Sequence, residues 1–496
     1  MKQSAKYFAY LILYLTLIFM VYEFMIYGCQ QVTFGEEDFQ IHLESLAYND
    51  SGIHGVWNKL VHRVHTQPFN LVSLVIFSLA VIHTLCASVF SKASASLRRK
   101  LGEDNFTVEV LRFLGEVEVV FGLWVIPLML SMALFYNWQS AIYYVNSRGF
   151  VEPIFVVVIM TISSTYPILN LVERGLSYIV KLGGETVQSW WWVLLTVGPL
   201  LGSFITEPGA MTVCALLLSK KFYNYKPSSL FAYGTLGLLF VNISVGGVLT
   251  CFAAPPVVLV SRVWGFDTLY MMQSFGWKAV VGILASNLCY FYYFRNEFAV
   301  MEKYRNSKEK TKTEEAEQVP HWISIIHAIF LSWIVLHSIY PVIVVGSFLL
   351  FIGFYQATKP FQHPLSLKTP VLVGFFLSAL IVHGGLQGWW ITPILGSVTE
   401  GVMMVSSIVL TAFNDNAEIT FLSTLIPDLD ESMKYAVIAG AVTGGGLTVI
   451  ANAPNPAGQA LLHKHFGAGI SAKNLFYAAL TPTVIVGLTF YCFRYY

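Results

Sequence analysis

Long apolar stretches, separated by shorter polar ones, run through most of the chain. A transmembrane helix needs about 20 mainly apolar residues, and windows of this length recur along the sequence. We predict apolar helical segments at 69–91, 113–137, 150–172, 189–219, 228–260, 269–294, 321–338, 340–357, 370–389, 395–426, 432–462 and 474–493. This pattern predicts an all-α polytopic membrane protein.

An earlier apolar run covers residues 7–28 and follows Lys2 and Lys6. It is longer than the apolar core of a signal peptide, roughly 7–15 residues, and no A-x-A sequence ends it. We expect the run to be retained as a leading transmembrane helix. Cleavage as a signal peptide stays open as the alternative.

The composition supports a membrane protein. Of the 496 residues, 56% are hydrophobic and 11% are charged, whereas roughly a quarter of the residues in a soluble domain are charged. The net charge of +1 gives no indication of a nucleic-acid partner. The six cysteines show no pairing or metal-ligand spacing, so we interpret them as small packing residues.

Clusters of Lys and Arg predict which loops face the cytoplasm. They occupy five polar segments, at 92–112, 220–226, 295–320, 359–368 and 464–473. All five lie on one side only if residues 189–219 and 395–426 each enter and leave the membrane by the same face. We therefore predict two re-entrant hairpins, about 11 transmembrane helices and a cytoplasmic N-terminus.

The expected organisation has a leading part and two transport repeats joined by a linker. In order, the parts are 1–68 (leading helix and short external segment), 69–294 (first repeat, with hairpin 189–219 and broken helix 228–260), 295–320 (charged cytoplasmic linker) and 321–496 (second repeat, with hairpin 395–426 and broken helix 432–462). In the external segment, His62 and His65 are expected to lie on a solvated helix face, with metal binding as the alternative.

An internal repeat links the two broken helices. The sequence GGVLTCFAAPP at 246–256 matches GGGLTVIANAP at 444–454, with an offset of 444 − 246 = 198 residues. The matched residues include Gly246, Gly247, Thr250, Gly444, Gly445 and Thr448. Because five helices intervene, the two halves start from opposite sides of the membrane, which predicts an inverted-topology repeat.

A polar hairpin tip precedes each motif, SFITEPGA at 203–210 and AFNDNAEI at 412–419. Aligning the tips on their phenylalanines sets Glu207 against Asn416. Glycines and prolines break a helix and free backbone groups, which persist at membrane depth only around a polar cavity. Close helix packing explains one Gly-Gly pair, but two copies, each after a polar tip, favour a transport site.

At these residues the chain resembles the ion transporter superfamily, which includes NhaD-type sodium/proton antiporters, arsenite efflux permeases and divalent anion/sodium symporters. The resemblance rests on NDNAE followed by GGGLTVIANAPN and on TEPGA followed by GGVLTCFAAPP, and it covers nearly the whole chain. The chain looks most like the sodium/proton antiporter (NhaD-like) branch. The anion symporters carry neutral Ser-Asn-Thr tips, which this chain does not.

The resemblance implies two groups of site residues. At the hairpin tips they are Thr206, Glu207, Asn414, Asp415 and Asn416. At the helix breaks they are Gly246, Thr250, Gly445, Thr448, Asn452 and Asn455, to which the repeat adds Gly247 and Gly444. The bacterial inner (plasma) membrane is the expected location, and a homodimer stays open.

Two acidic residues at the tips decide the expected chemistry. An ionisable group at the bilayer centre costs at least roughly 2.5–3.5 kcal/mol, which indicates a function for it. Glu207 and Asp415 would repel a dicarboxylate but suit Na⁺ or H⁺. Burial and mutual repulsion favour the protonated carboxyl, so that H⁺ and Na⁺ can compete for one site. Glu418, one helical turn beyond Asp415, is expected to modulate this site. The alternative for each acid is a structural hydrogen bond.

Other polar residues lie in the apolar segments. Glu116 and Glu118 cannot share a helix face, so we expect at most one of them to face the cavity. His383 is expected to make a packed polar contact between helices, and proton relay is its alternative role.

We predict a secondary sodium/proton antiporter that works by alternating access. Its partners are small cations and the lipid bilayer, and apart from the transported Na⁺ and H⁺ no cofactor is expected. The alternative is a cation-coupled carrier or efflux permease for an organic or inorganic solute. An intramembrane enzyme is not expected, because the sequence contains neither a Gly-x-Gly-Asp nor a His-Glu-x-x-His motif.

Overall fold

The computed structural model describes residues 48–101, 105–308, 319–395, 398–467 and 469–496. The leading helix expected at 7–28 lies outside them. The chain divides into two compact units, Met1–Ile53 and His54–Tyr496, and the second contains all the elements that follow. Its described residues form helices and no β-strand, which confirms the all-α class.

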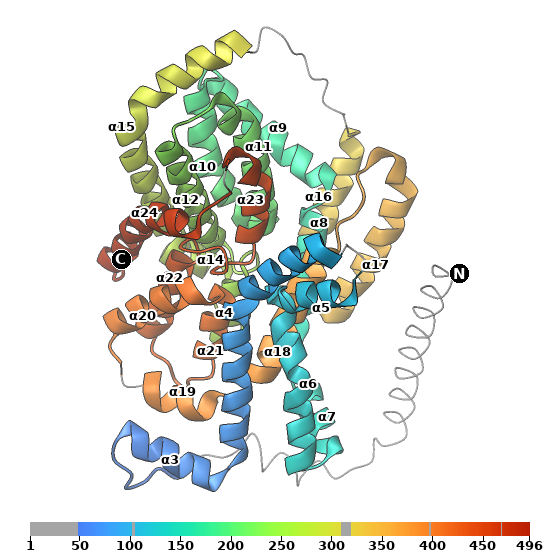
Figure 1. Cartoon of the computed structure of the whole chain (residues 1–496), viewed down its shortest axis with the longest axis vertical. Helices are drawn as coiled ribbons and strands as arrows, with labels where there is room; N and C mark the ends of the chain where they lie inside the picture. The colour runs from blue at the N-terminus through green and yellow to red at the C-terminus, as the bar shows by residue number, and fades with distance from the viewer. Residues whose placement is uncertain (1–47, 102–104, 309–318, 396–397, 468) are drawn as a thin grey trace. The chain divides into compact units, whose positions relative to one another are not determined.

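The first half of this unit runs from α3 to α15 (Figure 1). Its helices are α3 (Val56–Thr66), α4 (Phe69–Leu101), α5 (Phe106–Leu114), α6 (Val117–Phe135), α7 (Trp138–Asn146), α8 (Val151–Ser163), α9 (Tyr166–Leu182), α10 (Val187–Ile205), α11 (Glu207–Lys221), α12 (Ser229–Gly246), α13 (Pro255–Trp264), α14 (Thr268–Met271) and α15 (Trp277–Lys308). Short 3₁₀ turns η1 (Tyr223–Tyr225) and η2 (Gly247–Leu249) and a π-helix η3 (Met272–Gly276) lie between them.

The second half runs from α16 to α24. Its helices are α16 (His321–Leu336), α17 (Pro341–Thr358), α18 (Lys368–Gly384), α19 (Gly388–Leu395), α20 (Glu400–Phe413), α21 (Asn416–Ser423), α22 (Glu431–Gly444), α23 (Asn455–Leu462) and α24 (Ala472–Cys492), with 3₁₀ turns η5 (Lys359–Phe361) and η6 (His463–His465). The helices follow the apolar segments of the sequence, and the two expected broken helices are interrupted, after Gly246 and after Gly444.

Among the described residues, five helices are long and apolar enough to cross a membrane, and seven if each of two bent pairs counts as one span. The bent pairs are α7 with α8, at 55°, and α18 with α19, at 80°. Large apolar side chains such as Leu134, Leu336 and Val342 are exposed on their helices, as expected for contact with lipid. The membrane class is confirmed, whereas the count of about 11 spans is not reached by this criterion.

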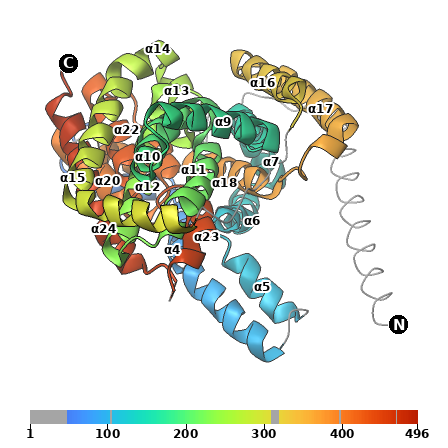
Figure 2. The ribbon, with the colours of Figure 1, turned by 90° about the horizontal axis from the view of Figure 1, so that it is seen from above.

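Two helix pairs form hairpins at the expected positions. The chain turns at Thr206 between α10 and α11, and at Asn414 and Asp415 between α20 and α21. Figure 1 shows the first pair in the upper half of the view and the second in the lower half. Across the halves, α11 packs against α23 and α13 packs against α21. Seen from above, α10, α11, α12 and α23 lie together (Figure 2).

A proline in the first hairpin leaves one backbone oxygen without its helical donor, and two buried side-chain amides donate to that oxygen instead. Pro199 lies inside α10 and has no N–H to donate to the backbone oxygen of Leu195, four residues earlier. The side-chain nitrogens of Asn242 in α12 and Asn287 in α15 both donate to that oxygen, each at 2.8 Å. These amides therefore tie the bent hairpin helix to its two neighbours.

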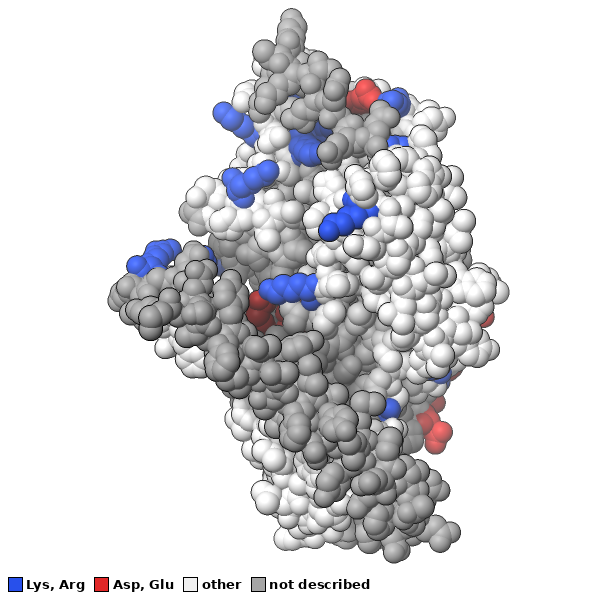
Figure 3. Space-filling view, turned by 90° about the vertical axis from the view of Figure 1, so that its right-hand side faces the viewer, with Lys and Arg blue, Asp and Glu red and all other residues white. Residues whose placement is uncertain are grey.

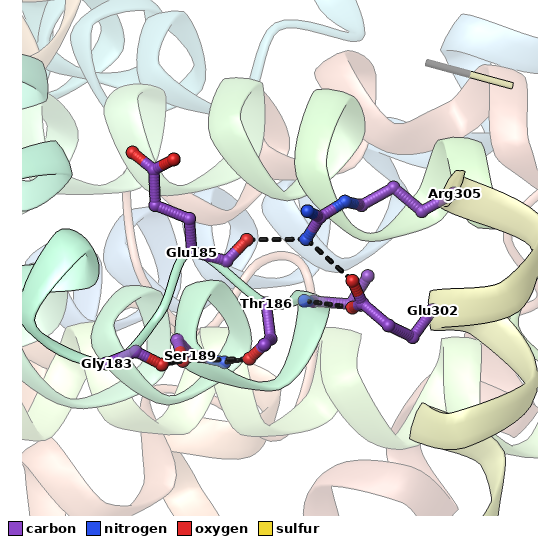
Figure 4. A network of polar contacts seen from close by, with 7 residues as sticks. Gly183, Glu185, Thr186, Ser189, Glu302 and Arg305 are labelled. Carbon is purple, nitrogen blue, oxygen red and sulfur yellow. Dashed lines mark hydrogen bonds and ion pairs between the residues drawn. The ribbon is translucent and has the colours of Figure 1, made fainter. Parts of the chain in front are cut away.

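The start of α10 is held by the end of α15, which continues to Lys308, so that the first part of the expected linker is helical. Glu302 accepts a hydrogen bond from the backbone N–H of Val187 at 2.8 Å and pairs with Arg305 at 2.9 Å (Figure 4). Arg305 also donates to the backbone oxygen of Glu185. A carboxylate at a helix N-terminus is favourable, so the α15 extension stabilises the first turn of the hairpin.

Candidate ion-binding site

The first hairpin tip places a carboxyl group in the protein interior. Thr206 has a φ of 65°, which L-residues seldom adopt, and its hydroxyl lies 3.0 Å from that of Ser163 in α8. Glu207, the first residue of α11, is completely buried. Its Oε2 accepts a hydrogen bond from the side-chain nitrogen of Asn452 at 2.9 Å. Its Oε1 has no hydrogen-bond partner among the described residues.

The second tip combines a helix cap with a buried amide. Asp415 precedes α21, and its Oδ1 accepts the backbone N–H of Ala417 at 2.8 Å. Asn414 accepts the backbone N–H of Asp415 at 3.1 Å. The neighbouring Asn416 is buried and donates its backbone N–H to Ala451 at 3.1 Å. Within the described part of the chain, neither polar atom of the Asn416 side chain has a partner.

Glycines at the helix breaks allow close approach to both tips. A Cβ on Gly247 would overlap the carboxyl group of Glu207. A Cβ on Gly445 would overlap Ser244 and lie 3.0 Å from the side-chain nitrogen of Asn416. The sequence repeat aligns Gly247 with Gly445, and the tips align Glu207 with Asn416, so equivalent contacts occur in the two halves.

In both halves, a glycine of the break lies close to the backbone of the hairpin, and a threonine donates a hydrogen bond to it. A Cβ on Gly246 would lie 2.5 Å from the backbone oxygen of Pro199, and one on Gly444 would lie 2.5 Å from that of Ile408. Thr250 and Thr448 each donate a hydroxyl hydrogen bond to the first helix of their own hairpin. These bonds measure 2.6 Å from Thr250 to Ser203 O and 2.8 Å from Thr448 to Ala412 O. The repeated motif therefore makes the same contacts with each hairpin.

The freed backbone groups of the two breaks are satisfied differently. In the second break, the side-chain nitrogen of Asn455 donates to the backbone oxygens of Gly445 and Thr448, each at 2.8 Å. In the first break, the hydroxyl of Ser203 donates to Gly246 O at 2.7 Å and accepts the N–H of Leu249 at 2.8 Å. Sequence analysis did not select Ser203, although it lies in the quoted tip sequence.

The acids around the tips interact electrostatically with one another. The negative charge of Asp415 repels that of Glu207 and also that of Glu418. Glu418 is 1% exposed, and its Oε2 has no hydrogen-bond partner among the described residues. Glu118 in α6 acts on Asp415, although it was not selected as a site residue. Its neighbour Glu116 instead pairs with a lysine of α18 at 2.8 Å.

The remaining polar candidates lie elsewhere. His383 of α18 is buried, and its Nε2 lies 3.1 Å from the backbone oxygen of Phe121 in α6. His62 and His65 are on α3, where no residue is buried. Among the described residues, no group of three or more His, Cys, Asp or Glu side chains is placed to hold a metal ion. The tips carry carboxylate, hydroxyl and amide groups. The oxygen atoms of these groups can coordinate Na⁺ together with freed backbone carbonyls.

Helix breaks that meet polar hairpin tips inside an apolar helical protein define the class of membrane transporters. The chain belongs to the family described as "Putative Na+/H+ antiporter", whose sequence profile matches residues 68–493. It is therefore an integral membrane protein of a cation-transporter family. A search among curated proteins finds no match.

Proposed function

We propose that the protein exchanges Na⁺ for H⁺ across the membrane, with Glu207 and Asp415 as the groups for which the two cations compete. One observation carries this proposal. Glu207 of the first half is hydrogen-bonded to Asn452 of the second half, while its other oxygen lies buried without a partner among the described residues. A buried carboxyl group with a free oxygen is suited to bind either a proton or a small cation.

The chemistry follows from the cost of burying a charge. An ionised carboxylate in a low-dielectric interior is unfavourable unless it is paired. Either H⁺ or Na⁺ neutralises it, and two negative charges near each other favour binding of a cation. In Asp415, Oδ1 caps α21, so we assign cation or proton binding to Oδ2. The amide oxygen of Asn416 serves as a neutral ligand.

The free-energy cost of a buried, unpaired charge also explains how access to the site alternates between the two sides of the membrane. A carrier whose site holds uncompensated charge changes conformation less readily than one whose site is neutralised by a bound cation. Exchange results if the protein reorients only with Na⁺ or with H⁺ bound. We assign the reorientation to the paired hairpins and broken helices, which make equivalent contacts in the two halves.

The orientation is part of the proposal. Lys and Arg side chains gather on the upper part of the face shown in Figure 3. In Figure 1 the end of α15, in the charged segment 295–320, also lies at the top. Since positive residues favour the cytoplasmic side, we assign this end to the cytoplasm of a bacterial inner membrane, with the N-terminus on the same side.

Purified protein in liposomes that contain a pH-sensitive dye tests the function. Adding Na⁺ or Li⁺ outside should move protons out of liposomes that contain the protein, and no such movement should occur in empty liposomes. A panel of K⁺, Na⁺ and Li⁺ gives the selectivity. If no cation drives proton movement while an organic or inorganic solute is carried, the antiport proposal is wrong and the carrier alternative replaces it.

A further inference from the structure

A pocket lies at the far end of the first hairpin from the acidic tip. Its volume is about 580 Å³, within the roughly 300–1,000 Å³ range of ligand pockets. It is lined by residues near the end of α11 and the start of α12, and by the segment that joins α23 to α24. The 15-residue helix α11 separates it from Glu207 by about 20 Å along the helix.

The charge of this pocket is positive. Lys226 and Lys464 line it, and none of the described lining residues is acidic. Neither lysine has a carboxylate partner among the described residues; the ammonium group of Lys226 lies 5.4 Å from the centre of the Tyr304 ring. Burial and then the nearby charge of Lys464 lower the pKa of His465. The positive charge of the pocket therefore comes from the two lysines.

The other polar groups define which atoms are available to a ligand. The hydroxyl of Tyr223 donates to Ala232 O at 2.9 Å, and that of Tyr233 accepts the N–H of Ser471 at 3.0 Å. Both tyrosines are thus used to build the wall. Asn474, in the first turn of the 21-residue helix α24, also lines the pocket. Its amide and the positive end of that helix add to the attraction for an anion.

The position of the pocket indicates the source of the anion. Its lysines belong to the basic segments 220–226 and 464–473, both expected on the cytoplasmic side of the membrane. Basic pockets between transmembrane helices on this side suit the head groups of anionic lipids. The pocket also joins the two halves, because Lys226 follows the first hairpin and Lys464 follows the second broken helix.

We propose that this pocket binds the phosphate group of an anionic phospholipid, with Lys226 and Lys464 as its cationic ligands and Asn474 as a neutral donor. Soluble phosphate has the same chemistry, and the two sources are separable by experiment. This inference is independent of the acids at the hairpin tips. If the wild type shows no antiport, the proposed function is contradicted and the lipid site is not.

The test uses the full-length protein in phosphatidylcholine nanodiscs, into which phosphatidylglycerol is introduced in steps while thermal stability is followed. The variant is Lys226→Asn with Lys464→Gln. Asn is chosen because Lys226 has a φ of 54°, in the left-handed region that Asn tolerates. The control is Lys220→Gln with Lys473→Gln, which removes the same charge from exposed positions on the same side, outside the lining.

Phosphatidylglycerol should raise the Tm of the wild type and of the control. In the double variant its apparent affinity should fall on the order of 30-fold. If the double variant does not fold, Lys464→Gln alone should show a fall of about 5-fold. The inference is overturned if phosphatidylglycerol and inorganic phosphate both leave the wild type unchanged. Equal stabilisation of the wild type and the variant also overturns it. Stabilisation by inorganic phosphate alone, lost in the variant, supports the site and identifies the soluble source.

Discussion

At the scale of single residues, the most informative contact joins Glu207 to Asn452, 245 positions apart in the sequence. One carboxylate oxygen is held by the amide, and the other has no hydrogen-bond partner among the described residues. A hydrogen bond to one oxygen fixes the orientation of the carboxyl group, so the second oxygen has a defined position for a cation. The orientation of this carboxyl group in the first half thus depends on a side chain of the second half.

Glu207→Gln tests this charge. The amide oxygen of Gln can still accept the hydrogen bond from Asn452, so the fold should be kept while the charge is lost. We expect the concentration of Na⁺ for half-maximal exchange to rise by at least about 10-fold, because one charge-assisted contact is worth roughly 1.5–3 kcal/mol. Exchange rates measured over a range of Na⁺ concentrations check this, and an unchanged Na⁺ dependence would exclude Glu207 as a ligand.

Asp415→Asn should abolish exchange. Asn keeps the shape and can still accept the N–H of Ala417, as an N-cap residue commonly does, but it cannot bind or release a proton. The matched control is Asp267→Asn, because Asp267 caps α14 through the N–H of Tyr270 in the same way. Sodium-driven proton flux should vanish in the first variant and persist in the second. Normal flux in correctly inserted Asp415→Asn protein would show that its carboxyl group is structural.

At the scale of helices, prolines leave carbonyl groups without a backbone donor, and side chains from other helices donate hydrogen bonds to them. Besides the pair of amides at Leu195, the hydroxyl of Tyr290 in α15 donates to Ala478 O at 2.7 Å, four residues before Pro482 in α24. The freed carbonyl accepts its hydrogen bond from a neighbouring helix, as expected inside a membrane. α15 provides such a donor to both α10 and α24 and therefore connects the first hairpin to the last helix.

The carbonyl freed by Pro199 gives a stability prediction. Asn242→Leu and Asn287→Leu should each lower the Tm, because each removes one donor to Leu195 O and breaks the hydrogen bond from Asn242 to Asn287. The double variant should lower the Tm further, because Leu195 O then has neither donor. Leaving a buried polar group unsatisfied costs about 1–3 kcal/mol. Thermal unfolding in detergent measures the effect, with Asn224→Leu at an exposed position as the control. A double variant with the same Tm as the control would mean that the two amides do not stabilise the hairpin through this oxygen.

The glycines of the breaks lead to a second prediction for the helices. Gly445→Leu should abolish exchange while the protein still inserts, because its Cβ would overlap Ser244 and crowd Asn416. Gly346→Leu is the control, since a Cβ on this α17 glycine would meet no atom within 4 Å. Flux and membrane insertion are measured for both variants. Wild-type flux in Gly445→Leu would show that the close approach is not needed for transport.

At the scale of the whole molecule, the two halves interlock. The second helix of each hairpin packs against the helix that follows the break of the other half, α11 against α23 and α21 against α13. Matched glycine and threonine contacts occur in both halves, as expected from the sequence repeat, and the inverted topology of that repeat stays a prediction. Such an arrangement makes it difficult for one hairpin to move without a response from the other half.

The inverted topology predicts opposite membrane sides for two exposed residues. In a variant without native cysteines, Ser307→Cys at the end of α15 should react with a membrane-impermeant maleimide only from the cytoplasmic side. Ser432→Cys at the start of α22 should react only from the other side. Both residues are exposed in the structure. Labelling of both from one side would contradict the second re-entrant hairpin, 395–426, which lies between the two positions.

The sequence by itself determined the membrane class, the helical segments and the position of both interruptions, because these depend on local hydrophobicity and on glycine and proline. It also indicated Glu207, Asp415 and Asn416, since acids and amides in an apolar stretch are costly unless they have a partner or a function. The repeat identified which residues of the two halves correspond, because it is present in the order of the residues alone.

Only the tertiary structure decided which of these groups meet. The bond between Glu207 and Asn452 and the electrostatic interaction of Glu118 with Asp415 depend on how helix faces pack. Apolar segments without a strong polar face do not reveal that packing in advance. The two amides at Leu195 were hidden for the same reason. A proline shows from sequence that a carbonyl is freed, but the helix that supplies its donor is set by the three-dimensional arrangement.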